Sequence, residues 1–294
     1  MDFDFTKITK MIYHKACHDG LACAGIIYKF KPDIEYFPAQ YDNELPNYEN
    51  ETILIADYSI SKENLLKYIE KNTVYFIDHH LPSLEYKHYF IAPHFYYVNK
   101  DNCGAINLWQ AVLDAASRLF PKNIFNTKLP IILQYVNDRD LWLNKLPHYQ
   151  EVFDGLTLQD KTVSNWSKLV YSTDEKLFQS ILTKGTIIRN KTNKEISYLA
   201  TKAYIKKFNY NNKNYNVIYV NSPILQSDLG SYLVQNNDVD FAAIYHYNGK
   251  INKTIFSLRG KDKVNLSDIA KSFGGGGHFN AAGCSIFGLN SELV

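Results

Sequence analysis

Three segments near the front of the chain carry side chains that can bind divalent metal ions. The turn from His14 to Gly20 holds two imidazoles, the thiol of Cys17 and the carboxylate of Asp19. Asp57 and the triplet Asp78-His79-His80 each follow a run of four apolar residues. Carboxylate and imidazole groups are common ligands of divalent metals. The residue types and their spacing therefore indicate a metal centre.

Each of these segments also has an ordinary structural interpretation. Asp19 could cap the helix that follows it, and Asp57 could simply begin a turn. The segment Asn137-Asp138-Arg139-Asp140 could be a charged helix end, or it could deliver a last carboxylate to the metals. The paired imidazoles of His79 and His80 are harder to explain structurally, because they follow a buried strand and acids occupy the ends of sister strands.

A glycine run near the end of the chain indicates a site for phosphate. The run from Gly274 to Gly277 is followed by His278 and then by Ala281-Ala282-Gly283. Glycine leaves backbone N–H groups uncovered, and a neighbouring His can donate to phosphate oxygens. A helix C-cap needs a single glycine, so four exceed the structural need. Arg259, at the end of a strand just upstream, could bind the same phosphate or pair with an exposed acid.

Alternating strand and helix patterns are expected to position these residues. In the first part of the chain, strands are predicted at Lys10–His14, Ile34–Tyr41, Thr52–Asp57 and Val74–Ile77, and helices at Leu21–Phe30, Lys62–Glu70 and Ala105–Phe120. This alternation predicts a parallel sheet with crossover helices. Ligands gather beyond the carboxyl ends of such strands, where His14, Asp57 and Asp78 all fall.

The length of 294 residues predicts two domains of the α/β class. We predict a metal-binding domain over residues 1–180, a helical connector over 181–208, and a smaller α/β domain over 209–294 that binds the substrate. Strands of the smaller domain are predicted at 215–220, 241–247 and 254–259, with Asn248-Gly249 as a turn. Its helices are predicted at 225–235 and 267–273.

Composition limits the classes of function. The formal net charge of +2 is too small to argue for long duplex DNA as a partner. No apolar stretch approaches the length of a membrane span, and the first ten residues lack the layout of a signal peptide. The four cysteines match neither a zinc ribbon nor a disulfide scaffold. A cytoplasmic location is the resulting expectation.

In their order along nearly the whole chain, these segments resemble the DHH phosphoesterases with a DHH-associated C-terminal domain, the nano-RNase and RecJ-like superfamily. The closing glycine-His-Ala-Ala-Gly signature is specific. The resemblance implies that Asp57 bridges two metal ions, that His14 binds the first, and that Asp19, His79 and Asp138 bind the second. It implies that Asp78 and His80, as catalytic residues, orient ligands or touch the substrate. The phosphate-binding groups that it implies are Arg259, Gly275, Gly276, Gly277 and His278.

The first motif departs from the family pattern. The family usually presents two carboxylates there, whereas here Asp19 matches the second and Cys17, or else His18, stands in place of the first. We predict Cys17 as the ligand, and a thiolate would lower the preference for manganese relative to zinc or iron. Asp140 is a second candidate for the last acidic ligand. We predict Asp138, because its distance from Trp142 fits the family pattern better.

The resemblance implies a two-metal phosphohydrolase or phosphodiesterase that cleaves phosphate esters of short nucleotides or single-stranded oligonucleotides in a cleft between its domains. Two divalent ions are expected, with manganese first and zinc, iron or cobalt as alternatives. Long duplex DNA and membranes are not expected as partners, and a homodimer is compatible with the sequence. The competing hypothesis is a catalytically silent protein that binds nucleotides or nucleic acid and whose altered first motif has lost one metal.

Overall fold

The computed structural model describes residues 2–15, 17–41, 43–120 and 128–293. Ala16, which belongs to the His14–Gly20 segment of the sequence analysis, lies outside the described residues. The chain divides into two compact units, Met1–Arg189 and Asn190–Val294. Each unit has its own sheet and its own hydrophobic core, so each is described by itself.

The first unit alternates strands with helices. Its elements are η1 (Phe5–Lys7), β1 (Lys10–His14), α1 (His18–Tyr28), β2 (Glu35–Ala39), β3 (Thr52–Ala56), α2 (Lys62–Lys71), β4 (Thr73–Asp78), η2 (Leu81–Tyr89), β5 (Phe95–Val98), α3 (Gly104–Leu119), α4 (Ile131–Asp140), α5 (Tyr149–Thr157), α6 (Val163–Tyr171) and α7 (Glu175–Ala200), whose last residues belong to the second unit. The five strands form one parallel sheet in the order β2-β1-β3-β4-β5. The predicted parallel α/β fold is confirmed, and β5 is a strand that the sequence pattern did not indicate.

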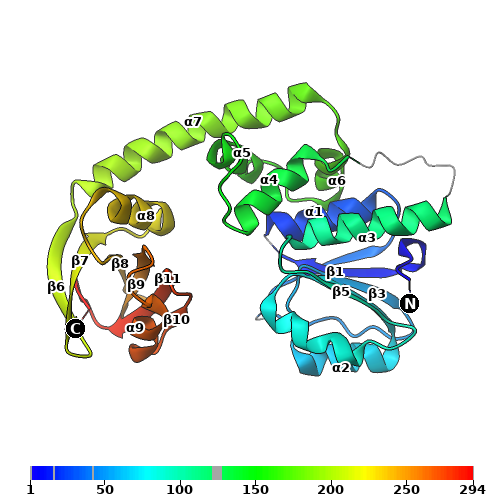
Figure 1. Ribbon diagram of the computed structural model, residues 1–294, viewed down its shortest axis with the longest axis horizontal. Helices are drawn as coiled ribbons and strands as arrows, with labels where there is room; N and C mark the ends of the chain where they lie inside the picture. The colour runs from blue at the N-terminus through cyan, green and yellow to red at the C-terminus, as the bar shows by residue number, and fades with distance from the viewer. Residues whose placement is uncertain (1, 16, 42, 121–127, 294) are drawn as a thin grey trace. The chain divides into compact units, whose positions relative to one another are not determined.

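The alternation of side chains along each strand places helices on both faces of this sheet. In β1, Met11 and Tyr13 join the core beneath α1 and α3, whereas Ile12 joins the core beneath α2. Figure 1 shows α1 and α3 on one face and α2 on the other. A parallel sheet covered on both faces reads as near-continuous apolar runs, which is the pattern seen before Asp57 and Asp78. Because helices cover both faces of the sheet, ligands can reach it at the carboxyl ends of its strands.

The second unit is built on a mixed sheet. Its elements after α7 are β6 (Tyr204–Tyr210), β7 (Lys213–Asn221), α8 (Gln226–Asn236), β8 (Phe241–Asn248), β9 (Lys253–Gly260), α9 (Leu266–Ser272), β10 (Gly276–Gly277) and β11 (Ala281–Phe287). The strand order is β10-β11-β9-β8-β7-β6, with β7 and β8 parallel and the other pairs antiparallel. Helix α8 packs on one face and α9 on the other. Strand β6 begins at Tyr204, within the range predicted as connector.

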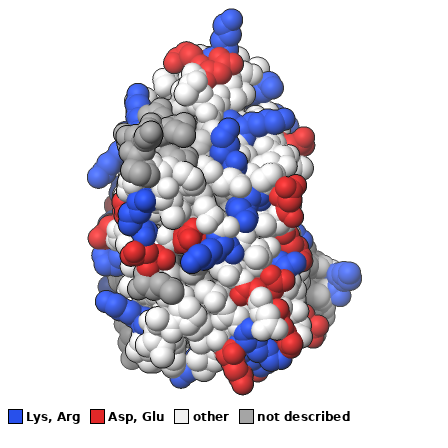
Figure 2. Space-filling model, turned by 90° about the vertical axis from the view of Figure 1, so that its right-hand side faces the viewer, with Lys and Arg blue, Asp and Glu red and all other residues white. Residues whose placement is uncertain are grey.

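Charged side chains of both signs are mixed on the face of the molecule that Figure 2 shows. On the face in Figure 2, Lys and Arg side chains are interspersed with Asp and Glu. This mixture agrees with the net charge of +2. Within the described ranges, no helix is both long enough and apolar enough to cross a membrane.

Candidate metal centre

Neighbouring strands bring the predicted ligands together at the carboxyl edge of the parallel sheet. His14 ends β1, Asp57 follows β3, and Asp78 ends β4. The two carboxylate oxygens of Asp57 face different imidazoles: Oδ2 lies 3.9 Å from His14 Nδ1, and Oδ1 lies 3.3 Å from His79 Nε2. Asp57 therefore stands between two groups of donors.

Two further carboxylates complete the second group. His79 Nε2 lies 3.8 Å from Asp19 Oδ2 and 3.4 Å from Asp140 Oδ2. In the part of the chain that the structure describes, the donor atoms within 4.8 Å of one another form three sets, which are His14, Cys17 and Asp57; Asp19, His79 and Asp140; and Asp57, Asp78, His79 and His80. The sequence predicted all but one of these residues as metal-binding or catalytic, the exception being Asp140.

The position of Asp19 is set by a helix distant in sequence. Its carboxylate accepts hydrogen bonds from the backbone N–H groups of Gly104 (2.7 Å) and Ala105 (2.8 Å), at the N-terminus of α3. Asp19 thus stabilises α3 and is not a side-chain cap of its own helix. A Cβ atom on Gly104 would lie 2.8 Å from Cβ of Asp57, so only glycine allows this approach. The sequence analysis did not identify Gly104. The one signal in the sequence is that this glycine stands directly before the predicted helix.

The pKa values of the central carboxyls show what burial costs this site. Burial raises the pKa of Asp19, Asp57 and Asp140, and neighbouring carboxylates raise those of Asp19 and Asp57 further. Asp57 is also held in the left-handed region, with φ 52°. Strain and buried like charges at one point are typical of functional sites.

A divalent cation fits these residues. Among the described residues, neither Asp57 Oδ2 nor Asp140 Oδ2 has a hydrogen-bond partner, although both oxygens are buried. Buried carboxylate oxygens are normally paired, and cations would provide the missing partners. The donor set of carboxylates and imidazoles suits manganese, iron or zinc. The site can thus hold metal ions, with Asp57 placed to be shared.

Asp78 is fully buried, and its carboxylate orients the ring of His80. Its Oδ1 is 2.7 Å from His80 Nδ1, and its Oδ2 accepts a hydrogen bond from the Ser83 hydroxyl. Burial alone would raise the pKa of Asp78, but these hydrogen bonds outweigh burial and hold it below its usual value. For His80, burial lowers the pKa and the Asp78 carboxylate more than reverses this, so its pKa is raised. His80 is thereby favoured as an imidazolium.

Cys17, and not His18, faces the donor groups. The thiol of Cys17 groups with His14 and Asp57, and its pKa is raised by burial and then by the nearby carboxylates. The ring of His18 instead packs against the rings of Phe153, at 4.8 Å, and Trp166, at 5.2 Å. Burial lowers the pKa of His18 to about 4. The geometry therefore favours the thiol as the donor that replaces the missing carboxylate.

The preference for Asp138 over Asp140 needs correction. Asp138 is buried, and its carboxylate accepts hydrogen bonds from the backbone N–H of Lys145 at 2.9 and 3.2 Å. Asp140 is the residue that reaches His79. Residues two apart on a helix point about 200° apart, so only one of the pair can face the centre. The direction in which each side chain leaves α4 therefore decides in favour of Asp140, against the prediction from the distance to Trp142.

In the second unit, the fold itself requires most of the glycine run. Gly274, with φ 71°, ends α9 in a Schellman motif, in which its N–H bonds to Lys271 O (3.0 Å) and the next N–H bonds to Ala270 O (2.8 Å). A Cβ on Gly275 would lie 2.1 Å from a backbone oxygen, and a Cβ on Gly277 would lie 2.5 Å from another. Only the Cβ position of Gly276 faces open space without a positive φ.

The other predicted phosphate-binding groups lie on adjoining strands. Arg259 on β9 pairs with Ala281 on β11, and Ala282 pairs with Gly277 on β10. The Arg259 guanidinium is half-buried and donates to Ser227 Oγ (2.5 Å) and to its neighbour's carbonyl oxygen (2.8 Å). His278 is exposed beside this strand end. The strand register therefore gathers these groups at one end of the sheet.

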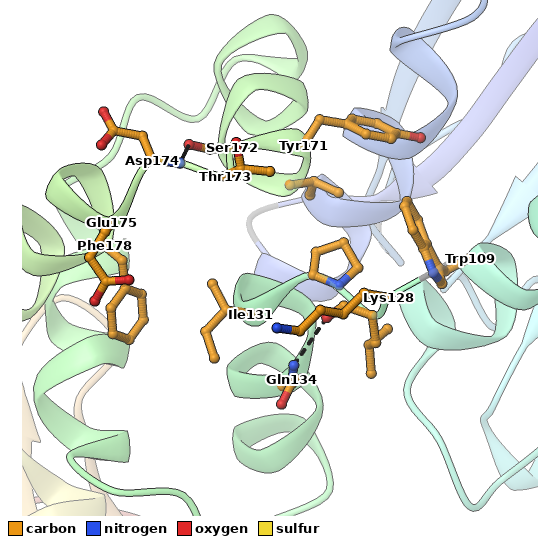
Figure 3. Close-up of a pocket in the computed structure, with 13 residues that line it drawn as sticks. Trp109, Lys128, Ile131, Gln134, Tyr171, Ser172, Thr173, Asp174, Glu175 and Phe178 are labelled. Atoms are coloured by element: carbon orange, nitrogen blue, oxygen red, sulfur yellow. Dashed lines mark hydrogen bonds between the residues drawn. The ribbon is translucent and has the colours of Figure 1, made fainter. Parts of the chain in front are cut away.

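A cavity elsewhere in the first unit contains none of these residues. It has a volume of about 660 Å³ and is lined by Trp109, Tyr171, Phe178 and aliphatic side chains, with Asp174 and Glu175 at its edge. Figure 3 shows Gln134 at this cavity with its side-chain amide, which donates to Leu129 O. The lining is largely apolar, so the candidate site rests on the carboxylate cluster and not on this cavity.

Residues 212–292 match the family model of the DHHA1 domain. Over 99% of its length, the chain is 27% identical to an uncharacterized protein of Acanthamoeba polyphaga mimivirus, and the match covers 70% of that protein.

Two of the similar solved structures align with nearly the whole chain. The pGpG-specific phosphodiesterase PggH from Vibrio cholerae aligns with a TM-score of 0.56 and 12% identity, covering 95% of this chain and 93% of that one. RecJ from Thermus thermophilus, solved in complex with Mn²⁺, aligns with a TM-score of 0.51 and 14% identity, covering 96% of this chain and 49% of that one. At these identities the likeness shows a shared fold.

Proposed function

We propose that this chain is a metal-dependent phosphoesterase of the DHH superfamily, and specifically a two-metal phosphohydrolase acting on short nucleotides. The observation that carries this proposal is the position of Asp57, whose two oxygens face His14 and His79. A carboxylate shared between two donor groups is suited to bridging two cations. The relatives that act on pGpG or bind Mn²⁺ have the same fold.

We assign the donors of each ion from the groups that lie together. His14, Cys17 and Asp57 would hold the first ion, and Asp19, His79 and Asp140, with Asp57 shared, would hold the second. When bound, divalent cations would supply Lewis-acid stabilisation of the charge that develops on phosphoryl oxygens. Manganese is proposed for the second group, whereas the thiol makes zinc or iron competitive at the first.

His80 is proposed to act on the substrate directly. Its Nδ1 is held by Asp78, which leaves Nε2 as the atom that can donate. The Asp78 carboxylate raises the pKa of His80 against the effect of burial, which favours the protonated ring. The protonated ring can then donate a hydrogen bond to a phosphate oxygen, or a proton to the leaving oxygen. Asp78 is the positioning residue in this account.

The second unit is proposed to bind the substrate's phosphates. We assign this role to Arg259, His278 and the backbone amides of Gly275, Gly276 and Gly277, with residues 209–294 as the substrate-binding domain and 1–180 as the catalytic one. The strand register that gathers these groups supports the proposal. We place the enzyme in the cytoplasm, in keeping with its four free cysteines.

The test is turnover of a substrate panel. It contains pApA, 3'-phosphoadenosine 5'-phosphate, cyclic di-AMP, a longer single strand and pyrophosphate, each with manganese, zinc or no added metal. We expect metal-dependent cleavage of a short nucleotide that is abolished in His79→Ala and retained in His88→Ala. His88 is an exposed imidazole of η2 outside the donor sets, so it controls for the loss of a His.

The same panel separates the enzyme from a silent binding protein. A silent protein would bind nucleotide and cleave no member with any metal. The first donor group still holds three ligand side chains, His14, Cys17 and Asp57, and this favours the enzyme. Nucleotide binding with no turnover in either metal would contradict the proposal, and Cys17→Asp would then be the variant to test for restored activity.

A further inference from the structure

The indole of Trp142 is unusually exposed for a side chain so near the candidate metal ligands. Trp142 is 62% exposed, whereas Trp109 and Trp166 are 6% and 0% exposed. It lies two residues after Asp140, and its backbone is left-handed, with φ 54°. This conformation is rare for a bulky residue. Exposure and strain beside Asp140 indicate a role in binding and not in packing.

A series of planar groups in contact with one another leads from this indole to the core. The Arg139 guanidinium carbon is 4.2 Å from the ring centroid of Trp142 and 4.9 Å from that of Phe153. The ring of Phe153 is 4.8 Å from that of His18, which is 5.2 Å from that of Trp166. We call these five groups the aromatic column. The column supports one face of the Trp142 ring, and its high exposure leaves the other face to solvent.

The aromatic column is fixed to the metal centre through the backbone. His18 immediately precedes Asp19, and Arg139 immediately precedes Asp140. The loop that carries Trp142 is held by Asp138, whose carbonyl oxygen accepts from Leu143 N at 2.9 Å and whose carboxylate accepts from Lys145 N. The outer face of the indole is therefore preorganised at a set position relative to the candidate ligands.

We propose that Trp142 stacks against a base of the substrate and so selects nucleotides over pyrophosphate and polyphosphate. This inference rests on the proposed function and names the substrate class of that site. Every nucleobase offers a flat π-face, so stacking on an aromatic side chain recognises a base without requiring a particular sequence. Arg139 beneath the ring contributes a cation–π contact that holds the indole in place. Substrates that consist only of phosphate offer no ring to stack.

The experiment measures quenching of tryptophan fluorescence by acrylamide with AMP or inorganic phosphate present, both with Mg²⁺. Trp142 is the exposed member of the three tryptophans, so it should give the accessible signal, which Trp142→Phe should remove. We expect AMP to shield Trp142 and phosphate to leave it accessible. Equal shielding by both, or by neither, would overturn the inference.

Binding of pApA by two variants supplies a second readout. Trp142→Ala should weaken pApA binding about tenfold, with Trp142→Phe restoring most of the affinity and pyrophosphate binding unchanged. Tyr198→Ala is the matched control, because Tyr198 is 63% exposed on α7. Unchanged affinity in Trp142→Ala would overturn the inference while leaving phosphoester hydrolysis intact. Shielding of Trp142 by AMP in a protein without turnover would support stacking and contradict the proposed function.

Discussion

The two units carry their unusual residues for different reasons. In the first unit, Asp19, Asp57 and Asp140 are packed together at a cost to the fold, since burial raises the pKa of each. In the second unit, Gly274, Gly275 and Gly277 are needed by the backbone itself. A conspicuous motif can therefore be functional in one unit and mainly structural in the other. A functional residue can be told from a structural one by asking whether the fold becomes more stable when that residue is replaced.

The largest effect is expected from Asp57→Asn. Removing the shared carboxylate should lower turnover about 10³-fold or more, because it weakens transition-state stabilisation at both donor groups. The metal-free variant should at the same time be more stable than the metal-free wild type, since a buried charge is lost. Steady-state kinetics and thermal unfolding measure the two effects. Asp33→Asn, an exposed acid, is the control, and a variant that loses both activity and metal-free stability would contradict this account.

The next effect separates Asp140 from Asp138. Asp140→Asn should reduce bound metal and lower turnover about 10²-fold. Asp138→Asn should retain metal and lose about 1 to 2 kcal/mol of unfolding free energy, because the Lys145 N–H bonds are weakened. Metal analysis and denaturant unfolding of both variants test this. The reverse pattern would restore Asp138 as the ligand.

Adjacent glycines of the second unit provide a matched pair. Gly275→Ala places a Cβ 2.1 Å from Gly283 O and should cost about 1 to 3 kcal/mol of unfolding free energy. Gly276→Ala has open space and should change stability by less than about 0.5 kcal/mol, while a methyl group in the phosphate site should weaken nucleotide binding. Denaturant unfolding and binding titrations decide the matter. Equal stability of the two variants would mean that the glycine run is not held by packing.

The smallest effect is a change of stability with pH in metal-free protein. The carboxyls of Asp19, Asp57 and Asp140 have pKa values above their usual 3.8. The folded state therefore binds more protons than the unfolded state, so stability falls as pH rises through the folded pKa values. The melting temperature with EDTA should therefore fall as pH rises above 3.8, and Mn²⁺ should raise it most at the higher pH. In Asp57→Asn, the melting temperature should change less with pH than in the wild-type protein. If the wild-type melting temperature changed with pH as little as that of the variant, the result would contradict the raised pKa values of the buried carboxyls.

The sequence could predict that the candidate ligands at the strand ends lie together, because their signals are local. His14, Asp57 and Asp78 each follow a buried strand, and parallel strands bring such ends to one edge. The role of Gly104 depends on the approach of α3 to Asp57, which no local pattern encodes. The choice between Asp138 and Asp140 depends on the phase of α4, where a shift of two residues reverses the direction of the side chain.

The sequence also could not predict the close contacts of the glycine run in the second unit or those of the aromatic column, because neither set is encoded in a local pattern. A helix C-cap at Gly274 could be expected from sequence, but the close approach of Gly275 to Gly283 joins strands that pair only in the folded sheet. His18 reaches Phe153 across more than a hundred residues. Contacts of this range follow from the packed fold and not from spacing along the chain.

The most direct test of the central claim is the metal content of the purified protein after loading with Mn²⁺ or Zn²⁺ and removal of free ions, measured by inductively coupled plasma mass spectrometry. We predict close to two equivalents per chain, falling to one or fewer in Asp57→Asn. Less than one equivalent in the wild-type protein with both metals, or no change in Asp57→Asn, would contradict a metal centre built on the shared carboxylate.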